Sequence, residues 1–160
     1  MEDALLLIAV FVFFFSHLFR DHREKERQDH EWWVSDCRNA LKAVSCEFEQ
    51  SCWEITDRYF EQHNRILCGY SRYTVTAKEL DTLSRISRDH LRAIKALKMD
   101  YLENPENASA WKSRMRNRTP PDYLMKEYQA EVSDIADAFF RINDIMRTQA
   151  EEIRPQSIEE

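Results

Sequence analysis

The chain has 160 residues, of which 43% are hydrophobic and 32% are charged, with a formal net charge of −6. This length fits one domain of ordinary size and excludes two catalytic domains. One glycine and four prolines are too few for a many-stranded sandwich or a glycine-rich phosphate loop. The sequence therefore predicts an all-α protein: an N-terminal single-pass transmembrane helix, followed by a bundle of three long helices and one short helix.

The first element is an apolar segment over residues 4–19, in which only Ser16 and His17 are polar. As a helix this segment is about 24 Å long, so a membrane crossing needs its flanking residues or a thinned bilayer. Acidic residues precede it and no small-residue cleavage site comes after it, which argues against a secretory signal peptide. We expect residues 1–20 to be a transmembrane anchor; the alternatives are a buried or oligomer-seam helix and a processed targeting peptide.

A charged juxtamembrane stretch, residues 21–30, comes after the anchor and sets its orientation. No Lys or Arg precedes the apolar segment, whereas four lie closely after it: Arg20, Arg23, Lys25 and Arg27. Basic flanks favour the cytoplasmic side of a membrane. We therefore expect the protein in the cell (inner or plasma) membrane, with its N-terminus outside and its body in the cytoplasm.

The same segment also permits a pore. Ionisable groups inside a membrane tend to face a helix bundle or water, so His17 could line a channel formed by several copies. The candidate pore residues are Phe11, Phe15, Ser16 and His17. The alternative is that Ser16 and His17 form an ordinary interfacial pair at the cytoplasmic end of the anchor.

The body, residues 31–154, has the pattern of a helical bundle. Apolar residues recur every three or four positions from Trp33 to Ile66 and predict a long amphipathic helix over about 31–67, which the charged stretch before it could extend. Gly69 marks its C-cap. Thr76 and Glu79 form a capping-box pattern that starts a second helix, which ends at Asn104 and Pro105.

Two further elements complete the bundle. Residues 105–117 predict a short helix with Trp111 and Met115 facing inward. A new start signal at residues 119–122 precedes the most regular helix, whose stripe consists of Leu124, Tyr128, Val132, Ile135, Phe139, Ile142, Met146, Gln149 and Ile153. This spacing fits either the seam of an antiparallel bundle or a coiled coil between subunits. Residues 155–160 are expected to be a disordered tail.

Charge is distributed unevenly along the body. Residues 77–118 hold ten basic and six acidic residues, net +4, whereas residues 119–160 hold four and ten, net −6. The predicted basic binding face consists of Arg85, Arg88, Arg92, Lys95, Arg114, Arg116 and Arg118. This face either pairs with acidic residues of the last helix, with Glu127, Glu131 and Asp134 as counterparts, or binds the phosphates of RNA or anionic lipids.

Motifs that carry chemistry are sparse. Cys37, Cys46, Cys52 and Cys68 form no CxxC pair and are expected to be small buried residues on helices. Nucleophile motifs, phosphate loops and HExxH are absent from the sequence. We therefore expect no metal, no cofactor and no small-molecule substrate.

One pattern occurs twice: Arg58 and His63, and Arg85 and His90, both have the form R-x4-H. This form resembles the RNA-cutting motif of HEPN-type helical ribonucleases, in which Arg and His from two bundle subunits meet at a dimer interface. The polar residue usual after the family arginine is replaced by Tyr59 and Ile86. On one helix an Arg and a His five residues apart point about 140° apart, so a joint site needs two helices or subunits. The alternative is that His90 is a bundle histidine and His63 a solvated one.

The sequence favours a non-enzymatic membrane protein whose cytoplasmic bundle self-assembles, binds a protein partner at the membrane, or does both. A first alternative is an oligomeric, membrane-perturbing pore. A second alternative is a HEPN-like ribonuclease.

Overall fold

The computed structural model describes the backbone of residues 2–68, 75–115 and 119–153, and their side chains except those of residues 2–12 and 14. The helices are α1 (Glu2–Cys68), α2 (Ala77–Glu103), the short α3 (Ser109–Arg114) and α4 (Asp122–Glu152), with a 3-10 turn, η1 (Pro105–Asn107), before α3. The described part contains no strand, and the prediction of an all-α chain with three long helices and a short one is confirmed. The expected tail, residues 155–160, lies outside the described residues.

The chain divides into two units, residues 1–39 and residues 40–160. The first unit is the N-terminal part of α1, which is helical from Glu2 and includes the charged stretch. There the guanidinium of Arg27 lies 3.8 Å from the carboxylate of Glu24 and 3.7 Å from that of Glu31. Such exposed pairs three and four residues apart support a solvated helix modestly.

Across the described residues, no helix combines the length and the apolar character that crossing a membrane requires. Most side chains of the expected anchor, residues 1–20, lie outside the described set.

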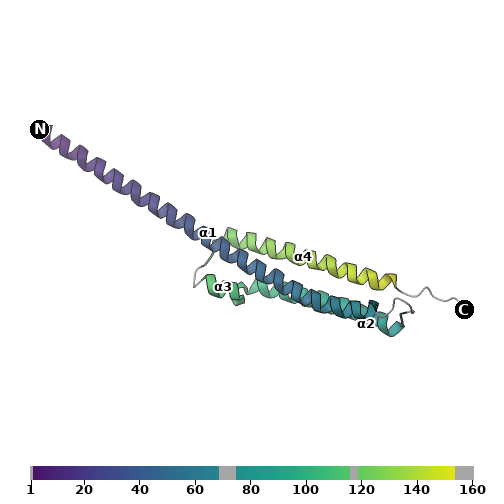
Figure 1. Cartoon of the computed structure of the whole chain (residues 1–160). Coiled ribbons are helices and arrows are strands. Elements are labelled where there is room, and N and C mark those ends of the chain that lie inside the picture. The colour runs from purple at the N-terminus through teal and green to yellow at the C-terminus, as the bar shows by residue number, and fades with distance from the viewer. Residues whose placement is uncertain (1, 69–74, 116–118, 154–160) are drawn as a thin grey trace. The chain divides into compact units, whose positions relative to one another are not determined.

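The second unit is a bundle of three long helices (Figure 1). Lys42 and Ser45 of α1 contact Glu131 of α4, and His63, farther along α1, contacts Met146, so these two helices run in parallel. α2 is antiparallel to both. Its end lies beside the beginning of α1 in this unit, with ring centroids of Phe48 and Tyr101 5.2 Å apart. The connection from α1 to α2 is short, whereas the one from α2 to α4 contains η1 and α3, and together they give this up-down-up order.

Local signals fix where α2 and α4 begin. The predicted capping box is present: the Thr76 amide donates to the Glu79 carboxylate over 2.8 Å, and the Thr76 side chain accepts from the first turn. α4 starts directly after Pro121, whose carbonyl accepts hydrogen bonds from Leu124 and Met125. Proline cannot donate a backbone hydrogen bond, so it suits a position where no helical partner is required.

The short element between them differs from its prediction. A single short helix was expected over 105–117, but Ala108, with φ −59° and ψ 141°, is extended and separates η1 from α3. Met115 is buried as predicted, whereas Trp111 is half-buried. Residues 116 and 117 lie outside the described residues.

The predicted core stripes are correct at some positions and shifted by one residue at others. α4 buries Leu124, Tyr128, Val132, Phe139 and Met146 as expected, but Ala136, Asn143 and Ala150 take the core positions predicted for Ile135, Ile142 and Gln149. α1 likewise buries Thr56 and His63, whereas Ile55 and Ile66 are half-buried. Neighbouring positions on a helix differ by about 100°, so a shift of one residue brings a different side chain into the core and moves the predicted one toward the edge of the core or the surface.

Candidate functional site

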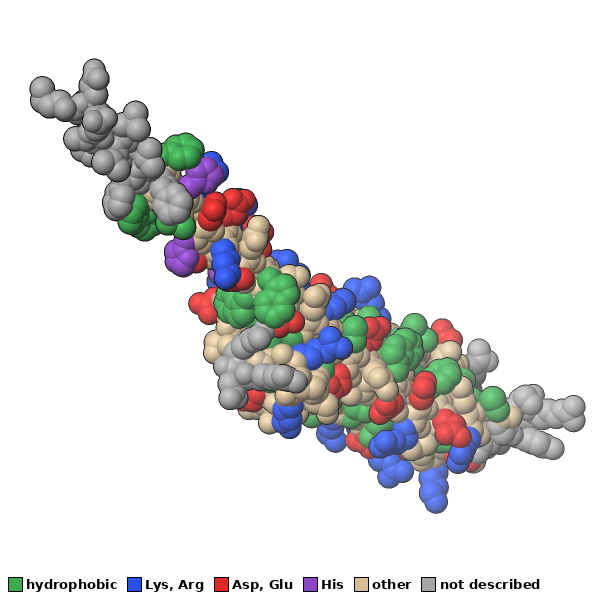
Figure 2. All heavy atoms as spheres, turned by 60° about the vertical axis from the view of Figure 1, so that its left-hand side comes forward, with side chains coloured by type: hydrophobic (Ala, Val, Ile, Leu, Met, Phe, Trp, Pro, Cys, Tyr) green, Lys and Arg blue, Asp and Glu red, His purple; other side chains and the backbone are tan. Residues whose placement is uncertain are grey.

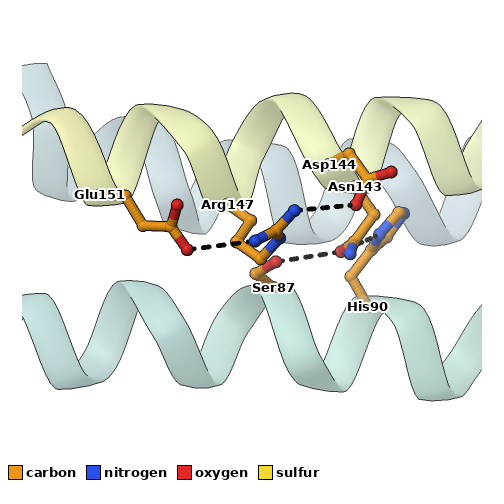
Figure 3. Close-up of polar contacts among 6 residues, drawn as sticks. All are labelled: Ser87, His90, Asn143, Asp144, Arg147 and Glu151. Atoms are coloured by element: carbon orange, nitrogen blue, oxygen red, sulfur yellow. Dashed lines mark hydrogen bonds and ion pairs between the residues drawn. The ribbon is translucent and has the colours of Figure 1, made fainter.

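A buried polar cluster lies where the three helices meet. It consists of Thr56 from α1, Ser87 and His90 from α2 and Asn143 from α4, all buried. His90 Nε2 lies 2.9 Å from the hydroxyl of Thr56, and His90 Nδ1 lies 3.1 Å from Oδ1 of Asn143. Ser87 donates its hydroxyl to the same oxygen over 3.2 Å (Figure 3). Each of the three helices thus contributes to one hydrogen-bonded layer.

The hydrogen bonds assign the form of His90. The side-chain oxygen of Asn143 only accepts, so Nδ1 of His90 carries the proton and Nε2 accepts from the Thr56 hydroxyl. Burial lowers the pKa of His90 below its ordinary value of 6.5, although the hydrogen bond with Asn143 acts in the opposite direction. His90 is therefore a neutral ring that joins three helices, and its prediction as a bundle histidine is confirmed.

His63 is a second buried ring, and the expectation that it is solvated was wrong. It lies seven residues after Thr56, so helical geometry places it on the same core-facing stripe. Nε2 lies 3.1 Å from the carbonyl oxygen of Met146, whereas Nδ1 is buried without a hydrogen-bond partner among the described residues. Burial lowers the pKa of His63, opposed by the hydrogen bond to Met146.

The R-x4-H motifs place their two residues in different environments. His63 and His90 are fully buried, whereas Arg58 and Arg85 are exposed. In the described residues the structure brings neither arginine into a hydrogen bond or ion pair with a histidine of these motifs. A hydrolytic site needs Arg and His within reach of one substrate, and the buried rings of this bundle are not open to RNA.

Glu47 of α1, which no sequence pattern singles out, ties α3 to the bundle. Its carboxylate accepts hydrogen bonds from the backbone amides of Ser109 (2.9 Å) and Ala110 (2.7 Å), and from the hydroxyl of Tyr101 (3.3 Å). Burial raises the pKa of Glu47, but the bonds from Ala110, Ser109 and Tyr101 outweigh it and hold the pKa below its ordinary 4.5. A carboxylate from another helix thus caps the first turn of α3.

The predicted basic face is only partly described. Arg85, Arg88, Arg92 and Lys95 are exposed along α2 and Arg114 is exposed on α3, whereas Arg116 and Arg118 lie outside the described residues. The predicted pairing of this face with Glu131 is wrong, because that carboxylate binds Lys42 and Ser45 of α1. Glu131 lies on the side of α4 that faces α1, so its carboxylate contacts α1 and not α2.

A further surface, which we name the apolar strip, consists of Trp53 and Phe60 of α1 and Ile135, Ile142 and Ile145 of α4. Trp53 and Phe60 are 48% and 42% exposed, and Ile145 is 57% exposed. The Trp53 ring packs edge-on against Phe139 with centroids 5.0 Å apart, which places this strip over the α1/α4 seam. Figure 2 shows hydrophobic side chains at the surface of the bundle among charged ones.

Among the candidate pore residues, Phe15 is 42% exposed and the Ser16 hydroxyl bonds to the carbonyl of Phe13 over 2.8 Å. The His17 ring lies 5.3 Å from the ring of Phe13 and 3.3 Å from the guanidinium of Arg20. The side chain of Phe11 lies outside the described residues. These are contacts within one helix, and the pore stays a prediction.

The cysteines agree with their prediction in part, since Cys37 and Cys52 are buried and Cys46 and Cys68 are exposed. Burial raises the pKa of the Cys52 thiol to about 12, with a smaller contribution from Glu49. Within the described ranges, no group of three or more His, Cys, Asp or Glu side chains is arranged to hold a metal ion. No protein-family model, curated protein or solved structure matches the chain.

Proposed function

We propose that the protein is a non-enzymatic assembly module whose bundle binds a second copy of itself through the apolar strip, while residues 1–20 hold it at a membrane. The observation that carries the proposal is the strip along the α1/α4 seam, in which Trp53, Phe60 and Ile145 are exposed and Ile135 and Ile142 are half-buried. Large apolar side chains that gather on one surface mark interaction sites more often than single exposed ones do.

The contacts between α1 and α4 make the strip continuous across the two helices. Lys42 and Glu131, Trp53 and Phe139, and His63 and Met146 pair residues that are 89, 86 and 83 positions apart. This register puts Phe60 level with Ile145, one helix away. Trp53, Phe60 and Ile145 therefore belong to one surface two helices wide.

The spacing of the strip favours a helical partner. Trp53 and Phe60 are seven residues apart, and on α4 Ile135 and Ile142 repeat the same interval, with Ile145 three residues farther on. A seven-residue repeat keeps a stripe facing a neighbouring helix as the two wind around each other. The stripe lies beside the core stripe of α4, so α4 has one face for its own bundle and one for another helix.

A second copy fits this surface because two-fold packing joins identical patches. In such a dimer the isoleucines of α4 in one copy lie against Trp53 and Phe60 of the other. Identical surfaces also carry identical spacing, so side chains seven residues apart interdigitate along the whole contact.

The membrane part of the proposal is supported by the apolar sequence of residues 4–19 and by the cations directly after it. Arg20, Arg23 and Arg27 are exposed at steps of three and four on α1. Cations directly after an apolar helix contact lipid headgroups and orient the helix. Such a tether raises the local concentration of the bundle at the bilayer and favours its self-association.

A site-specific photo-cross-linking amino acid tests the contact. We expect the full chain with this residue in place of Ile142 to form a covalent dimer on illumination at the membrane. The matched control carries it in place of Thr148, which is exposed on α4 but outside the strip. Equal cross-linking from both positions, or none from position 142, contradicts the proposed contact.

A further inference from the structure

The outward side of α2 carries a row of cations. Arg85, Arg88, Arg92 and Lys95 are spaced at steps of three, four and three residues, so they form one stripe about 15 Å long. All four side chains are exposed. The buried residues Ile86, Ser87, His90 and Ile94 occupy positions between them. The stripe therefore faces away from the bundle.

Among the described residues, no side chain of another helix forms an ion pair with this stripe. In the described residues its one ion pair joins Arg92 to Asp89 of the same helix, 3.5 Å away. Two acidic residues of α4 bind other cations: Glu131 contacts Lys42, and Asp137 lies 3.9 Å from Lys98. Asp81 lies one turn before the stripe and Glu103 two turns after it. A cationic row thus remains exposed on a chain of net charge −6.

We propose that this row binds the surface of a bilayer that contains anionic phospholipids. Four cations in line on one straight helix present a flat surface to the headgroups, and each adds to the attraction. Met99 lies one turn beyond Lys95 on the same side of α2 and is 50% exposed. An apolar side chain in line with cations suits the boundary between headgroups and acyl chains.

The same row fits single-stranded RNA less well. Sites for single strands combine cations with exposed aromatic rings on which bases stack. The one aromatic residue of α2 is Tyr101, which is buried and donates its hydroxyl to Glu47. The row can therefore attract phosphates but has no exposed ring on which bases could stack. This favours lipid headgroups over single-stranded RNA as its ligand. The inference uses neither the apolar strip nor residues 1–20.

Amine footprinting of the full chain tests this inference. The protein is mixed with phosphatidylcholine vesicles, or with vesicles that also contain phosphatidylserine. It is then treated with a membrane-impermeant reagent that modifies lysine amines. We expect Lys95 to react several-fold more slowly on the anionic vesicles, while Lys126, exposed on α4, reacts at the same rate on both. A chain that inserts into both kinds of vesicle still shows the difference at Lys95, so anchoring and headgroup binding are separated.

Variants make the test specific. Replacing Arg88 and Arg92 by Gln is expected to raise the concentration of anionic lipid that half-protects Lys95 about 25-fold, at about fivefold for each cation removed. Arg141→Gln, an exposed arginine of α4, is the matched control and keeps the protection. Equal reactivity of Lys95 on both kinds of vesicle overturns the inference. Protection by single-stranded RNA but not by anionic lipid overturns it as well.

Discussion

His90 of α2 and Asn143 of α4 share a hydrogen bond of 3.1 Å in the interior of the bundle, and Thr56 of α1 holds the other side of the same ring. A buried polar group is stable there only while its partners are in place. The layer fixes the three helices in one register, because sliding any helix by a residue leaves buried donors and acceptors without partners. Apolar side chains pack in several registers, whereas this set fits one.

Asn143→Ala is expected to destabilise the bundle by about 1–3 kcal/mol, because it leaves the Nδ1 proton of His90 and the hydroxyl of Ser87 buried without an acceptor. Asp144→Ala, at the exposed neighbouring position, is the control and changes stability little. Chemical unfolding of both variants measures the difference. Equal stabilities contradict a structural role for the layer.

Acid is expected to weaken the bundle through its two buried histidines. The pKa values of His63 and His90 are lower in the folded protein than their ordinary 6.5, so the unfolded chain binds more protons in this range. Stability therefore rises with pH below this value. The stability contributed by the two neutral histidines is fully present above about pH 6.5, and it is lost as the pH falls from there toward the folded pKa values. Urea unfolding between pH 8 and pH 5 measures this slope.

His63→Leu isolates one of these rings. Met146, whose carbonyl accepts from His63, lies within a helix, and leucine adds no buried group that requires a partner. The variant is expected to unfold with a shallower dependence on pH than the parent chain. A slope as steep as the parent's means that the acid sensitivity comes from other groups.

Glu47→Ala is expected to release α3 from the bundle. The carboxylate bonds to two backbone amides of α3, and loss of such a cap costs about 1–2 kcal/mol. Because the folded pKa of Glu47 is held below 4.5, its contribution is present above that pH and is lost as the pH falls through the folded pKa. Hydrogen exchange at the amides of Ser109 and Ala110 is expected to be faster in Glu47→Ala than in the parent chain. Glu49→Ala, at an exposed position of α1, is the control. Unchanged exchange in Glu47→Ala contradicts the cap.

The orientation of the proposed anchor has a direct test. Protease added outside intact cells is expected to leave residues 31–154 whole, because basic residues after an apolar helix favour a cytoplasmic body. Digestion of the bundle in intact cells contradicts this orientation. Protease added after the cells are lysed is the control and cuts the same protein.

Local signals allowed the fold to be predicted from sequence. Thr76, Glu79 and the prolines near 105 and 121 act within one turn of chain, so their positions mark the helix ends without knowledge of the rest. The number and order of the long helices result from these signals together with the apolar spacing. The division of the short element at Ala108 was missed, because nothing in its sequence neighbourhood marks an extended residue.

The candidate sites depend on contacts between helices, which spacing alone does not fix. Ile135 and Ile142 share the heptad spacing of the true core residues of α4, so the sequence fits two stripes equally well. Asn143 occupies the core because His90 and Ser87, more than fifty residues earlier, supply its partners. Burial of His63 could have been expected, since it lies eleven residues, or about three turns, after the predicted core residue Cys52 on one side of α1.

The native mass of the full-length protein in mild detergent tests self-assembly through the apolar strip most directly. We predict a discrete oligomer for the parent chain and for the control variant Thr148→Glu. Ile145→Glu, which buries a charge in the proposed contact, is predicted to be monomeric. A monomeric parent chain, or an Ile145→Glu variant of the same mass as the parent, contradicts the proposed assembly.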